Sequence, residues 1–311
     1  MEKNEKQACA IKTSVGGQAL IEGIMMKGPK KSAMAVRTPS GEIEVEEWET
    51  KVPGGVRKIP FVRGIFNFID TLITGYKCLM KSAEKAGEEE EPSKFELWIA
   101  EKLGKSAGDV FSFIVTVIAM VLAIGLFIVI PSGVTSLFSK HIENQMVLSA
   151  IEGVIKIAIF LVYIISVSKL DDIRRVFMYH GAEHKTIFCY EKGLELTVEN
   201  VREQIRFHPR CGTSFLLIVV IISILVSSVV TWSNLFLRIL IKFLLIPVIV
   251  GISYEIIKFA GRHDNALTKI ISAPGLWLQR FTTQEPDDSM IEVAIAAVTP
   301  VLPEDPEEAK W

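Results

Sequence analysis

Two long uncharged apolar runs constrain the fold of this 311-residue chain more than any other feature. Residues 110–130 and 213–231 are each about 20 residues long, enough for an α-helix to cross roughly 30 Å of hydrocarbon. The hydrophobic share of 50% and the mean hydropathy of +0.37 are too high for an ordinary soluble protein of this size. The sequence therefore predicts a membrane protein.

Two further apolar stretches, residues 147–167 and 237–257, have the same length but contain charged residues. With the two uncharged runs they predict four transmembrane helices and a mainly α fold. The first uncharged run is expected to end at Pro131, because proline and the glycine that follows it terminate helices. Pro247 and Gly251 are expected to kink the fourth helix.

The charges inside the predicted spans support two interpretations. Glu152 and Lys156 are four residues apart and can pair on one helix face, and Lys242 lies at a similar depth on the fourth span. The simpler interpretation is pairing combined with extension of the side chains toward the outer interface. The alternative is a polar path between the helices, which would suit a transporter or transport accessory.

The distribution of lysine and arginine predicts how the chain crosses the membrane. Seventeen of these residues precede the first span, one lies in 131–146, eight lie in 168–212, none lies in 232–236 and five lie in the tail from 258. Because positive residues accumulate on the cytoplasmic side, both termini and the central loop are expected in the cytoplasm of a multi-pass inner-membrane protein. The predicted regions are 1–109 (cytoplasmic), 110–167 (two spans), 168–212 (cytoplasmic loop), 213–257 (two spans) and 258–311 (cytoplasmic).

The cytoplasmic parts are expected to form a small α+β layer. Residues 33–37 and 41–48 predict a β-hairpin, because two strand-like runs flank the turn sequence Thr38-Pro39-Ser40-Gly41. Residues 61–86 predict an amphipathic helix that lies on the membrane or packs against the bundle. A further helix is expected from Met290, after Pro286 and its acidic neighbours.

Charge and cysteine content exclude other classes of protein. A net charge of −2 provides no electrostatic support for a nucleic-acid partner. The N-terminus is polar and lacks the pattern of a signal peptide. The four cysteines are scattered and predict no disulfide framework.

Residues able to bind metals concentrate in the central loop. Residues 179–211 hold three of the five histidines and two of the four cysteines. A helix is predicted over 172–192, where Gly193 is a suitable stop, and a shorter helix over 200–206, which Pro209 must end.

On the first of these helices, His180, Glu183 and His184 share an arc of about 100° together with apolar side chains. Two histidines four residues apart can bind one divalent ion, and a glutamate beside them can act as a base. The spacing His-x-x-Glu-His is that of the inverted zincins.

The segment before the third span adds His208 and Cys211, with a spacing suited to metal ligands. Three protein ligands would leave an open catalytic site for Zn²⁺ or a similar ion, whereas all four would close a structural one. Without a metal, the histidines would be hydrogen-bonded in a polar interior and Cys211 would be a small buried apolar residue. His141 and His263 are expected to lie outside the site.

Four motifs together resemble the bacterial YqhQ-like membrane family over nearly the whole chain, from about Val15 to Val298. The motifs are Gly16-Gly17-Gln18-Ala19-Leu20-Ile21-Glu22-Gly23-Ile24-Met25-Met26, His180-Gly181-Ala182-Glu183-His184-Lys185-Thr186, His208-Pro209-Arg210-Cys211-Gly212-Thr213-Ser214-Phe215 and Pro274-Gly275-Leu276-Trp277-Leu278-Gln279-Arg280. The resemblance implies a predicted metal-dependent enzyme of unknown substrate. It also implies that the first motif belongs to the functional unit, which makes Glu22 and Arg37 candidates for completing the site.

The leading hypothesis is a metal-dependent membrane hydrolase. His180, His184 and one or both of His208 and Cys211 would hold the ion, Glu183 would be the general base, and Arg210 would stabilise developing negative charge. A site at the inner interface favours a membrane-anchored, lipid-linked or peptide substrate. Two alternatives are a non-enzymatic scaffold that recruits a partner and is stapled by a His/Cys cluster, and the transport accessory introduced above.

Overall fold

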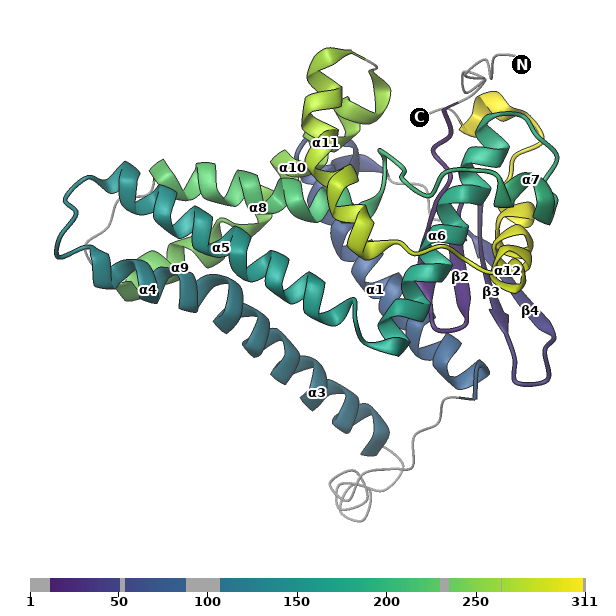
Figure 1. Cartoon of the computed structure of the whole chain (residues 1–311), viewed down its shortest axis with the longest axis horizontal. Coiled ribbons are helices and arrows are strands. Elements are labelled where there is room, and N and C mark those ends of the chain that lie inside the picture. Colours follow the sequence, from purple (N-terminus) through teal and green to yellow (C-terminus); the bar gives the residue numbers. More distant parts are fainter. Residues whose placement is uncertain (1–11, 51–53, 88–106, 230–234, 264, 310–311) are drawn as a thin grey trace, which may run out of the picture. The chain divides into compact units, whose positions relative to one another are not determined.

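The computed structural model describes residues 12–50, 54–87, 107–229, 235–263 and 265–309 (Figure 1). The described chain is mainly helical and contains one four-stranded antiparallel sheet. It divides into two compact units. The first consists of residues 1–88, 164–219 and 250–311, and the second of residues 89–163 and 220–249.

The predicted hairpin is part of a larger sheet. Four strands pair in chain order: β1 (Gly16–Leu20), β2 (Gly23–Lys27), β3 (Lys31–Arg37) and β4 (Ile43–Glu49). The pairing of β3 with β4 confirms the predicted hairpin. The prediction was incomplete, because β1 and β2 extend the same sheet. The sequence signal for β2 was weak because Ile24, Met25 and Met26 form a short continuous apolar run, which is typical of a strand covered on both faces.

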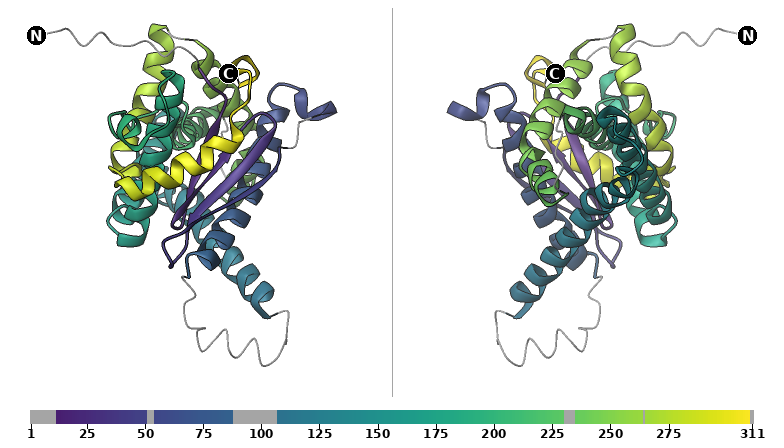
Figure 2. Two further views of the ribbon diagram at one scale, coloured as in Figure 1. Left: turned by 90° about the vertical axis from the view of Figure 1, so that its right-hand side faces the viewer. Right: turned by 90° about the vertical axis from the view of Figure 1, so that its left-hand side faces the viewer.

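Each face of the sheet packs on different helices, because successive side chains of a strand point to opposite sides. Ile24 and Ala35 belong to a core shared with α6 (Asp171–Glu191) and α12 (Asp288–Val298), whereas Met25 and Met34 pack with Cys78 of α1 (Val62–Lys85). Figures 1 and 2 show α12 running across the strands beside α6. The predicted α+β layer is therefore a sheet between two helical layers.

Three helices of the first unit, α1, α6 and α12, agree with the predicted positions. The amphipathic helix is α1, and α6 ends at Gly193, whose φ of 67° is the left-handed conformation that glycine adopts readily. The short helix α7 (Val198–Arg202) begins and ends earlier than predicted. This unit also contains α11 (Ala266–Thr282) and the 3₁₀ turns at Gly55–Lys58, Thr299–Val301 and Pro306–Ala309.

The apolar runs form long helices that indicate membrane association. Within the described ranges, two are long enough to cross a membrane. One is Phe113–Phe138, which starts inside α3 (Ala107–Ile124) and continues through a π-helical turn (Gly125–Val129) and α4 (Ile130–Phe138), and the other is α5 (Gln145–Val167). The helices α9 (Leu235–Leu244) and α10 (Ile246–Arg262) meet at a 43° bend and would provide a third span if they form one. The apolar helix α8 (Gly212–Val229) is shorter and stops beside residues outside the described ranges.

The expectation that the first span ends at Pro131 is wrong. The helix continues through Pro131 to Phe138 after the π-helical turn. Proline lacks an N–H and its ring crowds the preceding turn of a regular helix. A π-helical turn just before it changes the local hydrogen-bond pattern and lets the helix continue.

Candidate metal centre

The helix α6 presents the residues of the His-x-x-Glu-His motif on one side. His180 and His184 lie one turn apart, and their ring centroids are 4.4 Å from each other. Glu183 and His184 are buried, with exposed fractions of 5% and 1%, while His180 is partly exposed. This arrangement follows from helical spacing, as the sequence predicted.

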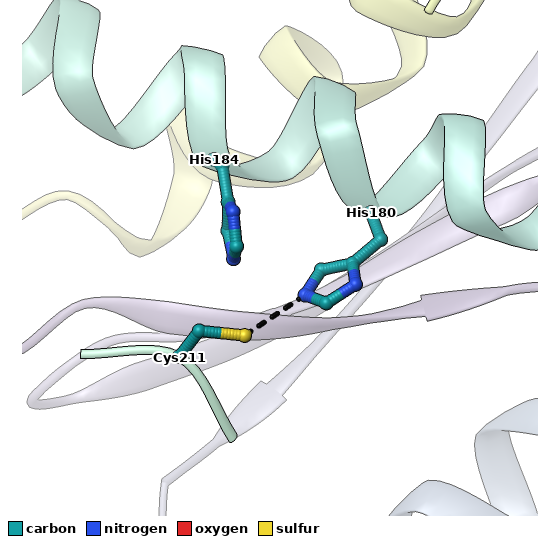
Figure 3. A group of neighbouring side chains, drawn as sticks. All are labelled: His180, His184 and Cys211. Carbon is teal, nitrogen blue, oxygen red and sulfur yellow. Dashed lines mark hydrogen bonds between the residues drawn. The ribbon is translucent and has the colours of Figure 1, made fainter. Parts of the chain in front are cut away.

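Cys211 joins the two histidines from the segment that leads into α8. Its sulfur lies 3.0 Å from Nε2 of His180, and one ligand atom from each of the three residues lies within 4.8 Å of the other two. Figure 3 shows both imidazoles projecting from α6 toward this sulfur. Nitrogen and sulfur ligands of one tetrahedral zinc ion are about 3.4–3.7 Å apart, so small side-chain movements would bring the three onto one ion.

Backbone carbonyl groups determine which nitrogen of each imidazole is free. Nδ1 of His180 lies 2.8 Å from the carbonyl oxygen of Thr282, and Nδ1 of His184 lies 2.5 Å from that of Arg206. A carbonyl oxygen only accepts hydrogen bonds, so each Nδ1 must carry the hydrogen. Nε2 is therefore the nitrogen of each imidazole that can serve as a ligand once it is deprotonated, in the arrangement common for metal-binding histidines.

Two buried polar atoms at this site have no hydrogen-bond partner among the described residues. They are Nε2 of His184 and Oε2 of Glu183. The other carboxylate oxygen of Glu183 accepts a 2.9 Å hydrogen bond from the backbone N–H of Gly17. Because buried polar groups are nearly always paired, two such atoms together fit a site that binds a further group. Two imidazoles and a thiolate suit Zn²⁺.

The electrostatics favour a thiolate at Cys211 and a protonated imidazole at His180, which must lose a proton when it binds an ion. Burial alone would raise the pKa of the Cys211 thiol, but the neighbouring His180 and His184 imidazoles lower it well below its usual range. Burial alone would lower the pKa of His180, but the Cys211 sulfur raises it to about 9. Burial raises the pKa of the Glu183 carboxyl, against the opposing effect of the two histidines. Cys211 is thus predisposed to be a thiolate, and Glu183 to accept a proton.

His208 and Arg210 belong to a separate buried network beside the three-ligand group. Nδ1 of His208 accepts a hydrogen bond from the backbone N–H of Arg210, and burial lowers the pKa of His208 to about 4 although the neighbouring Glu191 raises it. The Arg210 guanidinium pairs with Glu191, which also accepts a 2.8 Å bond from the N–H of Thr13. In this structure, Cys211 rather than His208 accompanies the two histidines.

Gln279 connects the candidate site to α11 and was not predicted from the sequence. Its side chain accepts from the backbone N–H of His208 at 2.8 Å and donates to the carbonyl oxygen of the same residue at 2.7 Å. This fully buried amide therefore positions the segment that carries Cys211. The only signal in the sequence was its place within the Pro274–Arg280 motif.

The N-terminal motif reaches the site through its backbone rather than through the two predicted side chains. Glu22 pairs with Arg175 and accepts a hydrogen bond from the Tyr179 hydroxyl. Arg37 pairs with Glu292 of α12. Neither side chain is part of the three-ligand group, and the residue of this motif that contacts the site is Gly17.

The comparisons with known proteins identify the family. Residues 59–304 match the model of the family described as "Protein of unknown function (DUF1385)". The chain belongs to this family. It is 36% identical over 298 residues to the uncharacterized protein YqhQ of Bacillus subtilis (strain 168), covering 94% of this chain and 93% of that protein. The family resemblance inferred from the motifs is thus confirmed, and no solved structure matches the chain significantly.

In this member of the family, the glycine between His180 and Glu183 is required by close packing. A Cβ atom on Gly181 would overlap with the carbonyl oxygen of Gln284 and lie 3.4 Å from Pro286. We expect Gly181→Ala to lower the free energy of unfolding by about 1–3 kcal/mol, because the backbone must shift to admit the methyl group. Thermal unfolding of the purified protein measures this loss.

The matched control for this substitution is Gly133→Ala, in α4. A Cβ there meets no atom within 4 Å, and alanine is the better helix former. The control should be neutral or stabilising. An unchanged unfolding temperature in Gly181→Ala would contradict the packing argument.

Proposed function

We propose that this protein is a metal-dependent membrane hydrolase in which His180, His184 and Cys211 hold a divalent ion such as Zn²⁺. One observation carries the proposal: three convergent side chains lie beside Oε2 of Glu183, a buried carboxylate oxygen that has no hydrogen-bond partner among the described residues. Three protein ligands are typical of catalytic sites, which keep one position for water or substrate.

Each residue has a distinct task in this proposal. The ion, when bound, would act as a Lewis acid on the substrate and as an activator of water. Gly17 holds Oε1 of Glu183, so Oε2 is the atom that takes a proton from the attacking water. The carbonyl groups of Thr282 and Arg206 orient the two imidazoles. Glu191 compensates the positive charge of Arg210. We therefore assign Arg210 the role of positioning the Cys211 segment rather than a direct role at the reacting atoms.

The finer features of the proposal come from the sequence. The lysine and arginine distribution supports four spans of an inner membrane with both termini in the cytoplasm. A site in the loop between α5 and α8 would then lie near the inner interface. This position supports a membrane-anchored or lipid-linked substrate.

The close packing of the site favours a second function, in which the ion is structural. Glu183, His184 and Cys211 are exposed by 7% or less, which also suits a structural ion that staples α6 to the start of α8. In that case the protein would be a scaffold that recruits a partner. The two functions share the ion and differ in whether Glu183 is needed for chemistry.

Metal analysis of the purified full-length protein tests the shared part of both functions. We expect about one ion per chain in the wild type, and less than about a tenth of that in His184→Ala, which removes one of three ligands. His263→Ala is the matched control, since His263 is exposed and its Nδ1 lies 3.0 Å from the carbonyl oxygen of Phe259 in α10. Equal metal content in wild type and His184→Ala would refute the site.

A further inference from the structure

The second unit contains a buried charged cluster that the proposed hydrolase does not use. Its members are Ser132 on α4, Glu152 and Lys156 on α5, and Arg238 and Lys242 on α9. The side chains of Glu152, Lys242, Lys156 and Arg238 are exposed by 5%, 6%, 10% and 13%. The helices that carry them are otherwise strongly apolar.

All three cations of the cluster share one carboxylate. Lys242 pairs with Oε1 of Glu152 and donates to the Ser132 hydroxyl at 3.1 Å. Arg238 donates to Oε2 at 2.7 Å, and Nζ of Lys156 lies 3.4 Å from Oε1. Both oxygens of Glu152 are therefore already occupied, and Ser132 adds a further donor to Oε1 at 3.1 Å.

The cluster carries an excess of positive charge. Three cations and one carboxylate leave a formal charge of +2, and among the ion pairs of the described residues these cations share Glu152 alone. Nε of Arg238 is also buried and has no hydrogen-bond partner among the described residues. Uncompensated charge in an apolar environment is costly and is normally paired. The arrangement thus lacks an anion.

We propose that this cluster binds a phosphate-type anion, either as the headgroup of an anionic lipid or as free phosphate. The arginine guanidinium offers a planar fork of hydrogen-bond donors, and the lysine ammonium offers a compact positive charge. Phosphate oxygens accept hydrogen bonds from both. Basic pockets between transmembrane helices bind phosphate headgroups in this way. Arg238 lies about one turn and Lys242 about two turns after the first residue of α9. A headgroup would therefore enter from this end of the helix, with its acyl chains along the apolar surface.

A double variant separates anion binding from folding. Lys156→Gln with Arg238→Gln removes two charges and leaves Glu152 paired with Lys242, so the cluster becomes neutral and the buried carboxylate keeps a partner. Lys140→Gln is the matched control, because Lys140 is an exposed cation in the connection between α4 and α5 of the same unit. The full-length proteins are purified in detergent and freed of lipid.

Binding is measured in two arms, by native mass spectrometry with phosphatidylglycerol or phosphatidylcholine and by thermal unfolding in inorganic phosphate or chloride. We expect wild type and Lys140→Gln to bind phosphatidylglycerol at least about ten-fold more tightly than the double variant, the effect of losing charged hydrogen bonds. A phosphate-dependent rise in unfolding temperature, absent from the double variant, would identify free phosphate as a ligand. Equal behaviour of wild type and double variant in both arms would overturn the proposal.

Discussion

A Glu183→Gln variant is expected to keep its fold and its metal and to lose activity by a factor of about 10²–10⁴, the contribution of a positioned general base. The glutamine amide has the same shape, and its oxygen can still accept the hydrogen bond that Gly17 donates to the native carboxylate. What it lacks is the capacity of Oε2 to take a proton. The variant therefore tests the catalytic role of Oε2 while leaving the fold and the metal ligands unchanged.

The readout of this prediction does not require a known substrate. Membrane extracts of strains carrying the deletion, Glu183→Gln or the wild-type gene are compared by untargeted mass spectrometry. The deletion and Glu183→Gln should accumulate the same compound, while Glu195→Gln, at an exposed glutamate after α6, should resemble the wild type. If Glu183→Gln matches the wild type while His184→Ala loses both metal and fold, the ion is structural and the scaffold function is preferred.

A Glu191→Ala variant is expected to lower the free energy of unfolding by about 3–5 kcal/mol, because it leaves a buried cation without its partner. The pair is deeply buried, with side-chain exposures of 7% for Arg210 and 1% for Glu191. Glu191 also accepts the N–H of Thr13, so the N-terminal segment loses a contact as well. Chemical unfolding in detergent measures the loss.

The matched control is Glu47→Ala, which breaks the exposed pair with Lys31. Exposed pairs contribute little, so no measurable change is expected. A Glu191→Ala protein as stable as the wild type would show that Arg210 finds another partner and that the network does not support the Cys211 segment.

The stability from Glu191 should also depend on pH. Burial alone would raise the pKa of its carboxyl, but His208 and Arg210 lower it below the usual value. A carboxyl with a lowered pKa in the folded state stabilises the protein above its unfolded pKa. The contribution is therefore present at neutral pH and is lost as the pH falls through the folded pKa.

Local geometry explains what could be predicted. Helical spacing alone placed His180, Glu183 and His184 on one side of a helix, and the apolar runs alone indicated the long helices. Strand β2 was missed because its apolar run has no alternation, and the helix through Pro131 was missed because a π-helical turn has no clear signal in the sequence.

Contacts between distant segments account for the rest. Whether Cys211 or His208 joins the two histidines depends on how residues 192–211 return to α6, and hydrophobic periodicity does not encode that path. The partners that orient the site are backbone groups of Gly17, Arg206 and Thr282, whose role no side-chain pattern in the sequence reveals. The sequence by itself determined the composition of the site and one face of its main helix. Only the tertiary structure brought Cys211 beside the two histidines, directed Nδ1 of each imidazole to a backbone carbonyl and left Oε2 of Glu183 without a hydrogen-bond partner among the described residues. These features depend on packing between segments that are far apart in the chain.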